Sequence, residues 1–255
     1  PELYSLLAHG GLTVPDHYVL SANPANWPGE LKELPGDRVV LKVISPEIVH
    51  KTELGGVRIA ANRPDDILAA AQEIVATVRK RGGKKLGASI IGIMVAEFVS
   101  GEARLGGQLL AGLRWTRDMG HVITIGFGGL DAEELAAAFL PGEATTLYSP
   151  ELMTPEEGLD KFKRSFAYRL VAGQARSGRK LLDDQSLLRL LTFFHNVANR
   201  FSNQPTTNWT IAELEVNPFL LRDGDCVAVD AFCRFSAGHE VESSVDVEKV
   251  RTLLE

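Results

Sequence analysis

The sequence lacks the features that define several large classes of protein. Only two of its 255 residues are cysteines, Cys226 and Cys233, and their spacing fits neither a disulfide framework nor a thiolate zinc site. No apolar run approaches the roughly 18 residues of a membrane span. With 27 basic and 33 acidic residues, the formal net charge is −6, and no basic stripe is present to meet duplex phosphates. We therefore expect neither a membrane nor a nucleic acid as a partner.

The N-terminus lacks the basic and apolar regions of a secretory signal peptide. Because cysteine is also scarce, a reducing compartment is favoured, and we expect a cytoplasmic protein. The chain starts at Pro1 without a methionine, which leaves open whether it is a processed or excised part of a longer protein.

The order of predicted elements indicates a mixed fold in two lobes. Hydrophobic residues make up 45% of the chain and charged residues 24%, which is typical of a globular protein. Periodicity and turn residues predict the following elements: helices 2–9, 64–81, 155–173 and 183–202, and strands 17–21, 38–44, 57–61, 89–96, 108–115, 121–127, 210–216 and 226–232. We predict an α/β or α+β fold with lobes 1–98 and 99–235, and an acidic tail, 236–255, with one helix.

The segment IAELEVNPFLLRDGDCVAVDAF, residues 211–232, places oxygen-bearing side chains on one face of a strand. Successive strand residues alternate faces, so Glu213, Glu215 and Asn217 share a face. Asp223-Gly224 is a strong hairpin signal, and counting back from this turn puts Asn217 opposite Asp230.

Opposite residues of an antiparallel pair lie about 5 Å apart at Cβ. An amide oxygen and a carboxylate at that distance suit Mg²⁺ better than zinc, which prefers His or Cys. The same pattern also fits a solvated hairpin face. Pro218 weakens the count, because proline removes a ladder donor and is often found at bulges.

The segment VVLKVISPEIVHKTELGGVRIA, residues 39–60, places two lysines, a histidine and a glycine pair between two strands. Lys42 stands in an apolar strand, where it either extends its ammonium from an edge to solvent or supplies a fixed charge for a phosphate. Gly55-Gly56 forms either a simple turn or a backbone that can approach a triphosphate. His50 is either structural or chemical.

Neither of the two commonest phosphate loops is present, since there is no GxxxxGK[ST] pattern and no GxGxxG after a strand. Instead, LKVISPEIVHKTELGGV resembles the K-x-x-S-P-x-I-x-H-K-[ST]-[DE]-x-G-G-V signature of the ATP-grasp β-subunit of ADP-forming acyl-CoA synthetases. AELEVNP followed by AVDA, and LLAHGGLTVP near the start, resemble further segments of that family. The likeness covers residues 3–235 and implies two lobes that grip ATP between them.

The resemblance implies roles for residues at matching positions in the first lobe. Lys42 would contact phosphates, and Gly55 and Gly56 would belong to the loop over them. Glu97 would lie at the adenine-side hinge. His50 matches a histidine proposed in these synthetases as a second phosphoryl carrier, since a neutral imidazole nitrogen can attack phosphorus and later leave.

In the second lobe the resemblance implies that Asn217 and Asp230 bind Mg²⁺, in agreement with the hairpin count. Glu215 would face the incoming phosphohistidine. Gln108 stands where the family usually has a glutamate, so a nucleotide contact would be altered. The glycine segment IGFGGLDAEEL, residues 125–135, and the turn at Met119-Gly120 also depart from the family pattern.

These observations lead to one main hypothesis and two alternatives. The chain would exchange a phosphoryl group between MgATP or MgADP and a phosphohistidine on a CoA-binding α-subunit or fused domain, which would handle the acid and CoA. The first alternative is a nucleotide-sensing module of a larger protein, such as a protein acetyltransferase. The second is a stand-alone ligase that activates a carboxylate itself, although the His-Lys-Thr loop is typical of the relay enzymes.

Overall fold

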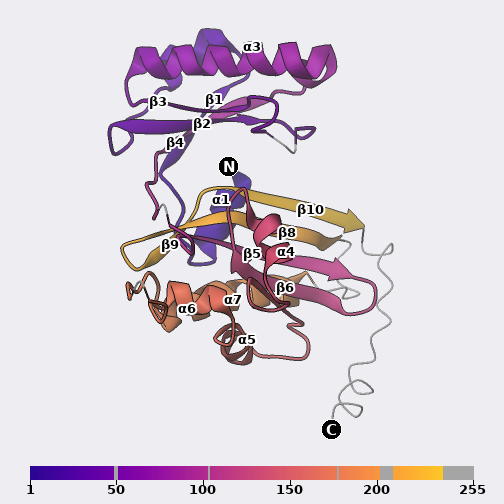
Figure 1. The fold of residues 1–255 in the computed structure, drawn as a ribbon. Coiled ribbons are helices and arrows are strands. Elements are labelled where there is room, and N and C mark those ends of the chain that lie inside the picture. Colours follow the sequence, from indigo (N-terminus) through magenta and orange to yellow (C-terminus); the bar gives the residue numbers. More distant parts are fainter. Residues whose placement is uncertain (49–50, 103, 177, 202–208, 238–255) are drawn as a thin grey trace. The chain divides into compact units, whose positions relative to one another are not determined.

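The computed structural model describes residues 1–48, 51–102, 104–176, 178–201 and 209–237 (Figure 1). The chain separates into two compact units, which we call the first and the second unit. The first unit contains Pro15–Val99, and the second contains Glu2–Val14 together with the chain from Ser100 onward. The N-terminal helix, which the sequence analysis placed in the first lobe, thus packs with the second unit. Among the described residues, no helix combines the length and apolarity needed to cross a bilayer.

The first unit is a four-stranded antiparallel sheet in the order β1-β4-β2-β3, with helix α3 against it (Figure 1). Its elements are β1 (His17–Ser21), η1 (Pro24–Asn26), α2 (Trp27–Glu30), β2 (Arg38–Ile44), β3 (Val57–Ala61), α3 (Pro64–Ala88) and β4 (Gly92–Glu97). The predicted bounds of β1, β2 and β3 are confirmed. Leu41 and Val43 of β2 pack into a buried core with Ile74 of α3.

Helix α3 is interrupted near the position where the sequence predicts its end. Gly83 has φ 71° and ψ −175°, a conformation outside the helix that glycine adopts without steric cost. A short helical segment then continues to Ala88, so the following strand starts at Gly92 rather than at residue 89.

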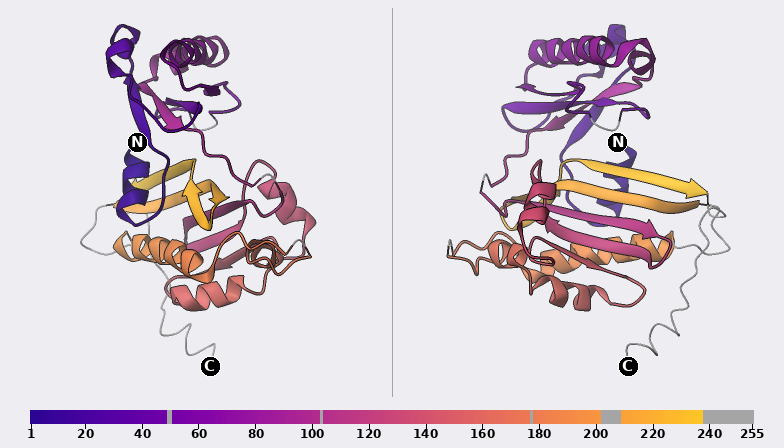
Figure 2. Two further views of the ribbon diagram at one scale, coloured as in Figure 1. Left: turned by 90° about the vertical axis from the view of Figure 1, so that its left-hand side faces the viewer. Right: turned by 45° about the vertical axis from the view of Figure 1, so that its right-hand side comes forward.

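The second unit is built on a larger antiparallel sheet in the order β10-β8-β5-β6-β7, with β9 also paired to β8. Its strands are β5 (Gln108–Thr116), β6 (Gly120–Phe127), β7 (Thr145–Tyr148), β8 (Trp209–Arg222), β9 (Asp225–Ala228) and β10 (Ala231–Ala237). Its helices are α1 (Glu2–His9), α4 (Ala132–Ala138), α5 (Pro155–Phe162), α6 (Phe166–Val171) and α7 (Asp184–Arg200). Figure 2 shows α5, α6 and α7 gathered on one face of this sheet.

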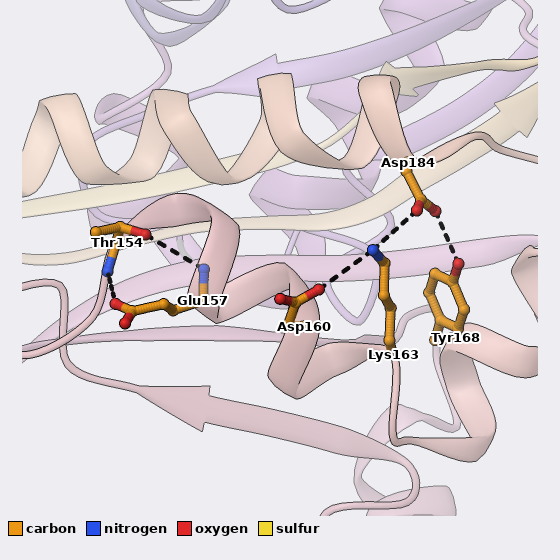
Figure 3. Close-up of polar contacts among 6 residues, drawn as sticks. All are labelled: Thr154, Glu157, Asp160, Lys163, Tyr168 and Asp184. Atoms are coloured by element: carbon orange, nitrogen blue, oxygen red, sulfur yellow. Dashed lines mark hydrogen bonds and ion pairs between the residues drawn. The ribbon is translucent and has the colours of Figure 1, made fainter.

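The predicted helix 155–173 is wrong in one respect, because it is two helices. Thr154 and Glu157 form a capping box at the start of α5: Glu157 N–H donates to Thr154 Oγ1, and Thr154 N–H donates to the Glu157 carboxylate (Figure 3). Ser165 then accepts a hydrogen bond from Tyr168 N–H and begins α6. A second N-cap inside the segment therefore divides it.

A charged cluster joins these two helices to the first turn of α7 (Figure 3). Lys163 Nζ lies 3.2 Å from Asp160 Oδ1 and 3.0 Å from Asp184 Oδ2. The Tyr168 hydroxyl donates to Asp184 Oδ1 over 2.7 Å. Hydrogen bonds from Tyr168 and Lys163 lower the pKa of Asp184, and the negative charge at a helix N-terminus is itself favourable. The cluster fixes where α7 starts against the sheet.

A buried polar pair lies where α7 meets the edge strand β7. The rings of His195 and Tyr148 have centroids 5.5 Å apart, and His195 is 5% exposed. Within the described part of the chain, neither His195 Nε2 nor the Tyr148 hydroxyl has a hydrogen-bond partner. Burial lowers the pKa of His195. The fold thus disfavours the protonated form of this imidazole.

We predict that the free energy of unfolding decreases as pH falls from 7 to 5. Because the folded pKa of His195 lies below its unfolded value, the unfolded chain binds more protons in acid. The stabilisation is complete above about pH 6.5 and is lost as pH falls through that value toward the folded pKa. Urea unfolding at both pH values should show a smaller decrease for His195→Phe than for the wild type, and an unchanged decrease for Tyr148→Phe. An equal decrease in all three proteins would contradict the prediction.

Candidate functional site

The hairpin of β8, β9 and β10 has the register that the sequence predicts. Arg222 pairs with Asp225 across the turn. Further back, Asn217 N–H donates to the Asp230 carbonyl over 3.1 Å. Pro218, whose peptide bond with Asn217 is cis, lies at a bulge against the neighbouring strand β5. The bulge shifts the β5 pairing and leaves the hairpin pairing unchanged, so the prediction that Asn217 opposes Asp230 is confirmed.

Asn217 is the centre of a group of polar contacts in the second unit. Gly129 N–H donates to Asn217 Oδ1 over 2.8 Å. The side chain of Asn217 also acts on the nearby carboxylate of Glu215, whose pKa it lowers. Gly129 has φ +98°, and a Cβ built there would lie 2.5 Å from Gln108 Oε1. The glycine turn after β6 therefore brings Gln108, Glu215 and Asn217 together, which requires glycine at residue 129.

Carboxylates concentrate around this group. Burial, followed by repulsion from Glu213 and Glu133, raises the pKa of Glu215, and the hydrogen bond from Asn217 opposes this shift. Glu213 has a partial counter-charge in Arg234, with Nη2 3.4 Å from Oε2. The repulsion means that a cation near these side chains would be stabilised.

Asp230 lies at the junction between the hairpin and helix α1. The buried Tyr4 hydroxyl donates to the Val229 carbonyl, 2.5 Å away. Burial and then the charge of Asp230 raise the pKa of Tyr4. No local sequence pattern points to Tyr4, because only the fold brings α1 beside a segment more than 200 residues away.

The oxygen ligands around Asn217 fit a hard cation. Within the described residues, no group of three or more His, Cys, Asp or Glu side chains is arranged to hold a metal ion. Such a group is what zinc or iron would need. Mg²⁺ needs less from the protein, since it is usually bound by one or two side-chain oxygens together with water and phosphate oxygens. Asn217 and Asp230 are suited to that smaller contribution.

Lys42 occupies an interior position of the first unit's sheet. Its strand β2 lies between β4 and β3, where Lys42 pairs with Met94 and Val57. It is only 9% exposed. The alternative of a lysine that reaches solvent from an edge strand is therefore not supported, because β2 is not an edge strand. A lysine buried on an interior strand is suited to a fixed electrostatic role.

The backbone N–H groups of Gly55 and Gly56 form hydrogen bonds within their own turn. Gly55 N–H donates to the Thr52 carbonyl over 3.0 Å, and Gly56 N–H donates to the Lys51 carbonyl over 2.7 Å. Gly55 has φ +71°, and an added Cβ would lie 2.6 Å from Thr77 Cγ2. The structure thus explains both glycines by turn geometry and close packing. Any binding of phosphate by these two N–H groups would require their turn hydrogen bonds to open.

Glu97 ends β4 two residues before the division at Val99 and Ser100. Asp16 N–H donates to Glu97 Oε2 over 3.2 Å, and Glu97 N–H donates to the Asp16 carbonyl over 2.9 Å. Asp16 lies next to the other crossing between units, at Val14 and Pro15. Glu97 therefore joins the two segments through which the chain passes between units.

The predicted site residues fall into two groups. Lys42, Gly55, Gly56 and Glu97 belong to the first unit, whereas Gln108, Glu215, Asn217 and Asp230 belong to the second. His50, the predicted relay histidine, lies outside the described residues.

Comparison with known proteins identifies the family. Residues 1–234 match the ATP-grasp domain. The chain therefore belongs to the ATP-grasp family, and the predicted fold is confirmed. Its fold is similar to that of the dinucleotide-forming acetyl-coenzyme A synthetase 1 of Ca. Korarchaeum cryptofilum, with a TM-score of 0.69 at 22% identity over 92% of this chain and 90% of that chain.

The curated relatives described here are all named as ADP-forming CoA ligases. The chain is 25% identical to the acetate–CoA ligase [ADP-forming] I subunit beta of Pyrococcus furiosus, over 91% of this chain and 88% of that protein. It is 29% identical to acetate–CoA ligase [ADP-forming] I of Archaeoglobus fulgidus and 28% identical to 4-hydroxybutyrate–CoA ligase [ADP-forming] of Nitrosopumilus maritimus. These matches cover 83% and 84% of this chain, but only 27% of each of those longer proteins.

We predict that Gly55→Ala destabilises the protein more than Gly36→Ala. Both glycines have positive φ, +71° and +81°, but an added Cβ meets nothing within 4 Å at Gly36 and meets Thr77 at Gly55. The left-handed conformation costs about 1–2 kcal/mol in each variant, and crowding adds to this cost only at Gly55. Urea unfolding should show the difference, and Thr77→Ala should reduce it. Equal losses in the two single variants would show that the packing at Gly55 is loose.

Proposed function

We propose that this chain is the ATP-grasp subunit or domain of an ADP-forming acyl-CoA synthetase. The overall reaction would be acid + CoA + ATP ⇌ acyl-CoA + ADP + phosphate. The observation that carries this proposal is the oxygen-rich group around Asn217, in a chain whose matched relatives are ADP-forming CoA ligases. The chemistry expected of this group is that of a magnesium nucleotide site.

The chain would act with a CoA-binding partner. The Pyrococcus relative is named as one subunit, whereas the Archaeoglobus relative is a single longer protein of which this chain spans about a quarter (27%). A separate α-subunit or a fused domain is therefore the expected source of the CoA site, the acid site and a phosphohistidine. The acyl group would be selected on that partner.

The residues of the chain would position a phosphoryl group for transfer. The bond between the γ-phosphorus and its bridging oxygen would break, and a bond from phosphorus to a histidine nitrogen would form, leaving ADP. Lys42 would contact phosphate oxygens and Glu215 would orient the incoming imidazole. Mg²⁺ bound by Asn217 and Asp230 would supply charge neutralisation. His50 would carry the phosphoryl group between two sites too distant for one direct transfer.

The nucleotide-sensing module remains a second candidate because of one residue. Gln108, which contacts the Gly129 turn, is uncharged where the family usually has a glutamate. Weaker polarisation of a nucleotide would slow turnover more than binding. Against this candidate, the segment Glu215-Val216-Asn217-Pro218 of the family pattern is intact.

We predict that His50→Ala abolishes turnover while nucleotide binding is retained. The measurement uses γ-³²P-ATP and the chain purified together with its CoA-binding partner, and it follows both acid- and CoA-dependent ADP release and label on protein histidine. The wild type should carry base-stable, acid-labile label. His17→Gln, which changes another histidine of the first unit, should behave as the wild type.

Two results would contradict this account. Unchanged turnover of His50→Ala would remove the relay role. Absence of histidine label in the wild-type complex, with all substrates present, would remove the phosphoryl-transfer mechanism and favour the sensing module if ATP still bound.

A further inference from the structure

Helix α3 contacts the β2–β3 loop at several points. We define this loop as residues 45–48 and 51–56, the described part of the chain between Ile44 and Val57. Three residues of α3, Thr77, Arg81 and Lys85, and the C-cap residue Ser89 each lie against one described residue of the loop. The four pairs are Thr77 with Gly55, Arg81 with Glu53, Lys85 with Glu47, and Ser89 with Ser45.

The start of the loop is held by a chain of hydroxyl hydrogen bonds. Ser89 Oγ donates to the Leu86 carbonyl over 2.8 Å. The contact of 2.7 Å between Ser45 Oγ and Ser89 Oγ therefore uses the proton of Ser45. Glu47 N–H in turn donates to Ser45 Oγ over 3.2 Å. The two hydrogen bonds of Ser89 are partly buried, whereas the bond from Glu47 N–H is exposed.

The end of the loop is held by Arg81 and Thr77. Arg81 Nη1 donates to the Glu53 carbonyl over 3.0 Å. Two residues further on, the backbone of Gly55 packs so closely on Thr77 that a Cβ would be 2.6 Å from its methyl group. A hydrogen bond from a charged donor is stronger than one from a neutral donor. Because the acceptor here is a backbone carbonyl, no acceptor side chain has to be ordered.

The remaining contact is weaker. Lys85 Nζ lies 3.8 Å from Glu47 Oε2, with side chains 87% and 43% exposed. Such an exposed ion pair contributes little to stability and is screened by salt. Among these four contacts, the hydrogen bonds of Arg81 and Ser89 are therefore the ones expected to contribute most to holding the two ends of the loop.

We infer that helix α3 positions the β2–β3 loop for phosphoryl transfer, through Arg81 at the end of the loop and Ser89 at its start. Arg81 and Ser89 are positioning residues, since each acts through the loop backbone or Ser45. The chemistry assigned to the loop rests on the proposed function. The contacts themselves do not, so the two parts can be tested separately.

The first test measures amide hydrogen exchange of Gly55 and Gly56 in the full chain. Their N–H groups donate within the turn, so they exchange only when the turn opens. Arg81→Ala should increase their exchange rates about tenfold, the factor that corresponds to one hydrogen bond of about 1.4 kcal/mol. Lys80→Ala, which removes the same charge from the exposed neighbouring position, should leave the rates unchanged. Equal rates in all three proteins would overturn the inference, whatever the enzyme does.

The second test measures steady-state kinetics of the same variants in the complex with the CoA-binding partner. Arg81→Ala should lower kcat about tenfold, because a misplaced reacting group slows transfer, with little change in KM for ATP. Arg81→Lys, which keeps a donor and the charge, should recover most of kcat. Faster exchange with unchanged kcat would overturn the link to the reaction. A wild-type complex without turnover would refute the proposed function, and the exchange rates would still decide whether Arg81 holds the loop.

Discussion

The backbone hydrogen bond from Asn217 to the Asp230 carbonyl determines the geometry of the second unit's polar group. Because it continues the ladder that starts at the Asp223-Gly224 turn, it fixes which residue of the returning strand stands beside Asn217. A shift of the returning strand by one residue would replace Asp230 with an apolar neighbour, Val229 or Ala231. The candidate cation site is therefore a consequence of strand register.

The first unit contains a charged side chain, Lys42, within an apolar sheet. Lys42 is on an interior strand with Leu41 and Val43 on either side in sequence, so its charge cannot simply extend past an edge. Burying a charge is costly unless it is paired. Under the proposed function this lysine would contact phosphate oxygens, and α3 would hold the neighbouring β2–β3 loop.

Much of this arrangement could be predicted from the sequence, since its signals are local. The alternation of β8 and the Asp-Gly turn were sufficient to pair Asn217 with Asp230. Other features depend on tertiary contacts. The β7 segment, Thr145–Tyr148, is too short for a periodic signal, and an N-cap at Ser165 divides an otherwise helical stretch. The use of the Gly55 and Gly56 N–H groups within their own turn, and the interior place of β2, could be learned only from the folded chain.

We propose that Asn217 and Asp230 bind the same cation. The most direct measurement is a double-mutant cycle with Asn217→Ala and Asp230→Ala, in which the affinity for ADP is measured with and without Mg²⁺. The account predicts that each single variant loses most of the Mg²⁺-dependent gain in affinity, and that the double variant loses little more, because either change disrupts one shared site. Losses that add in the double variant, or an undiminished Mg²⁺ effect in either single variant, would contradict it.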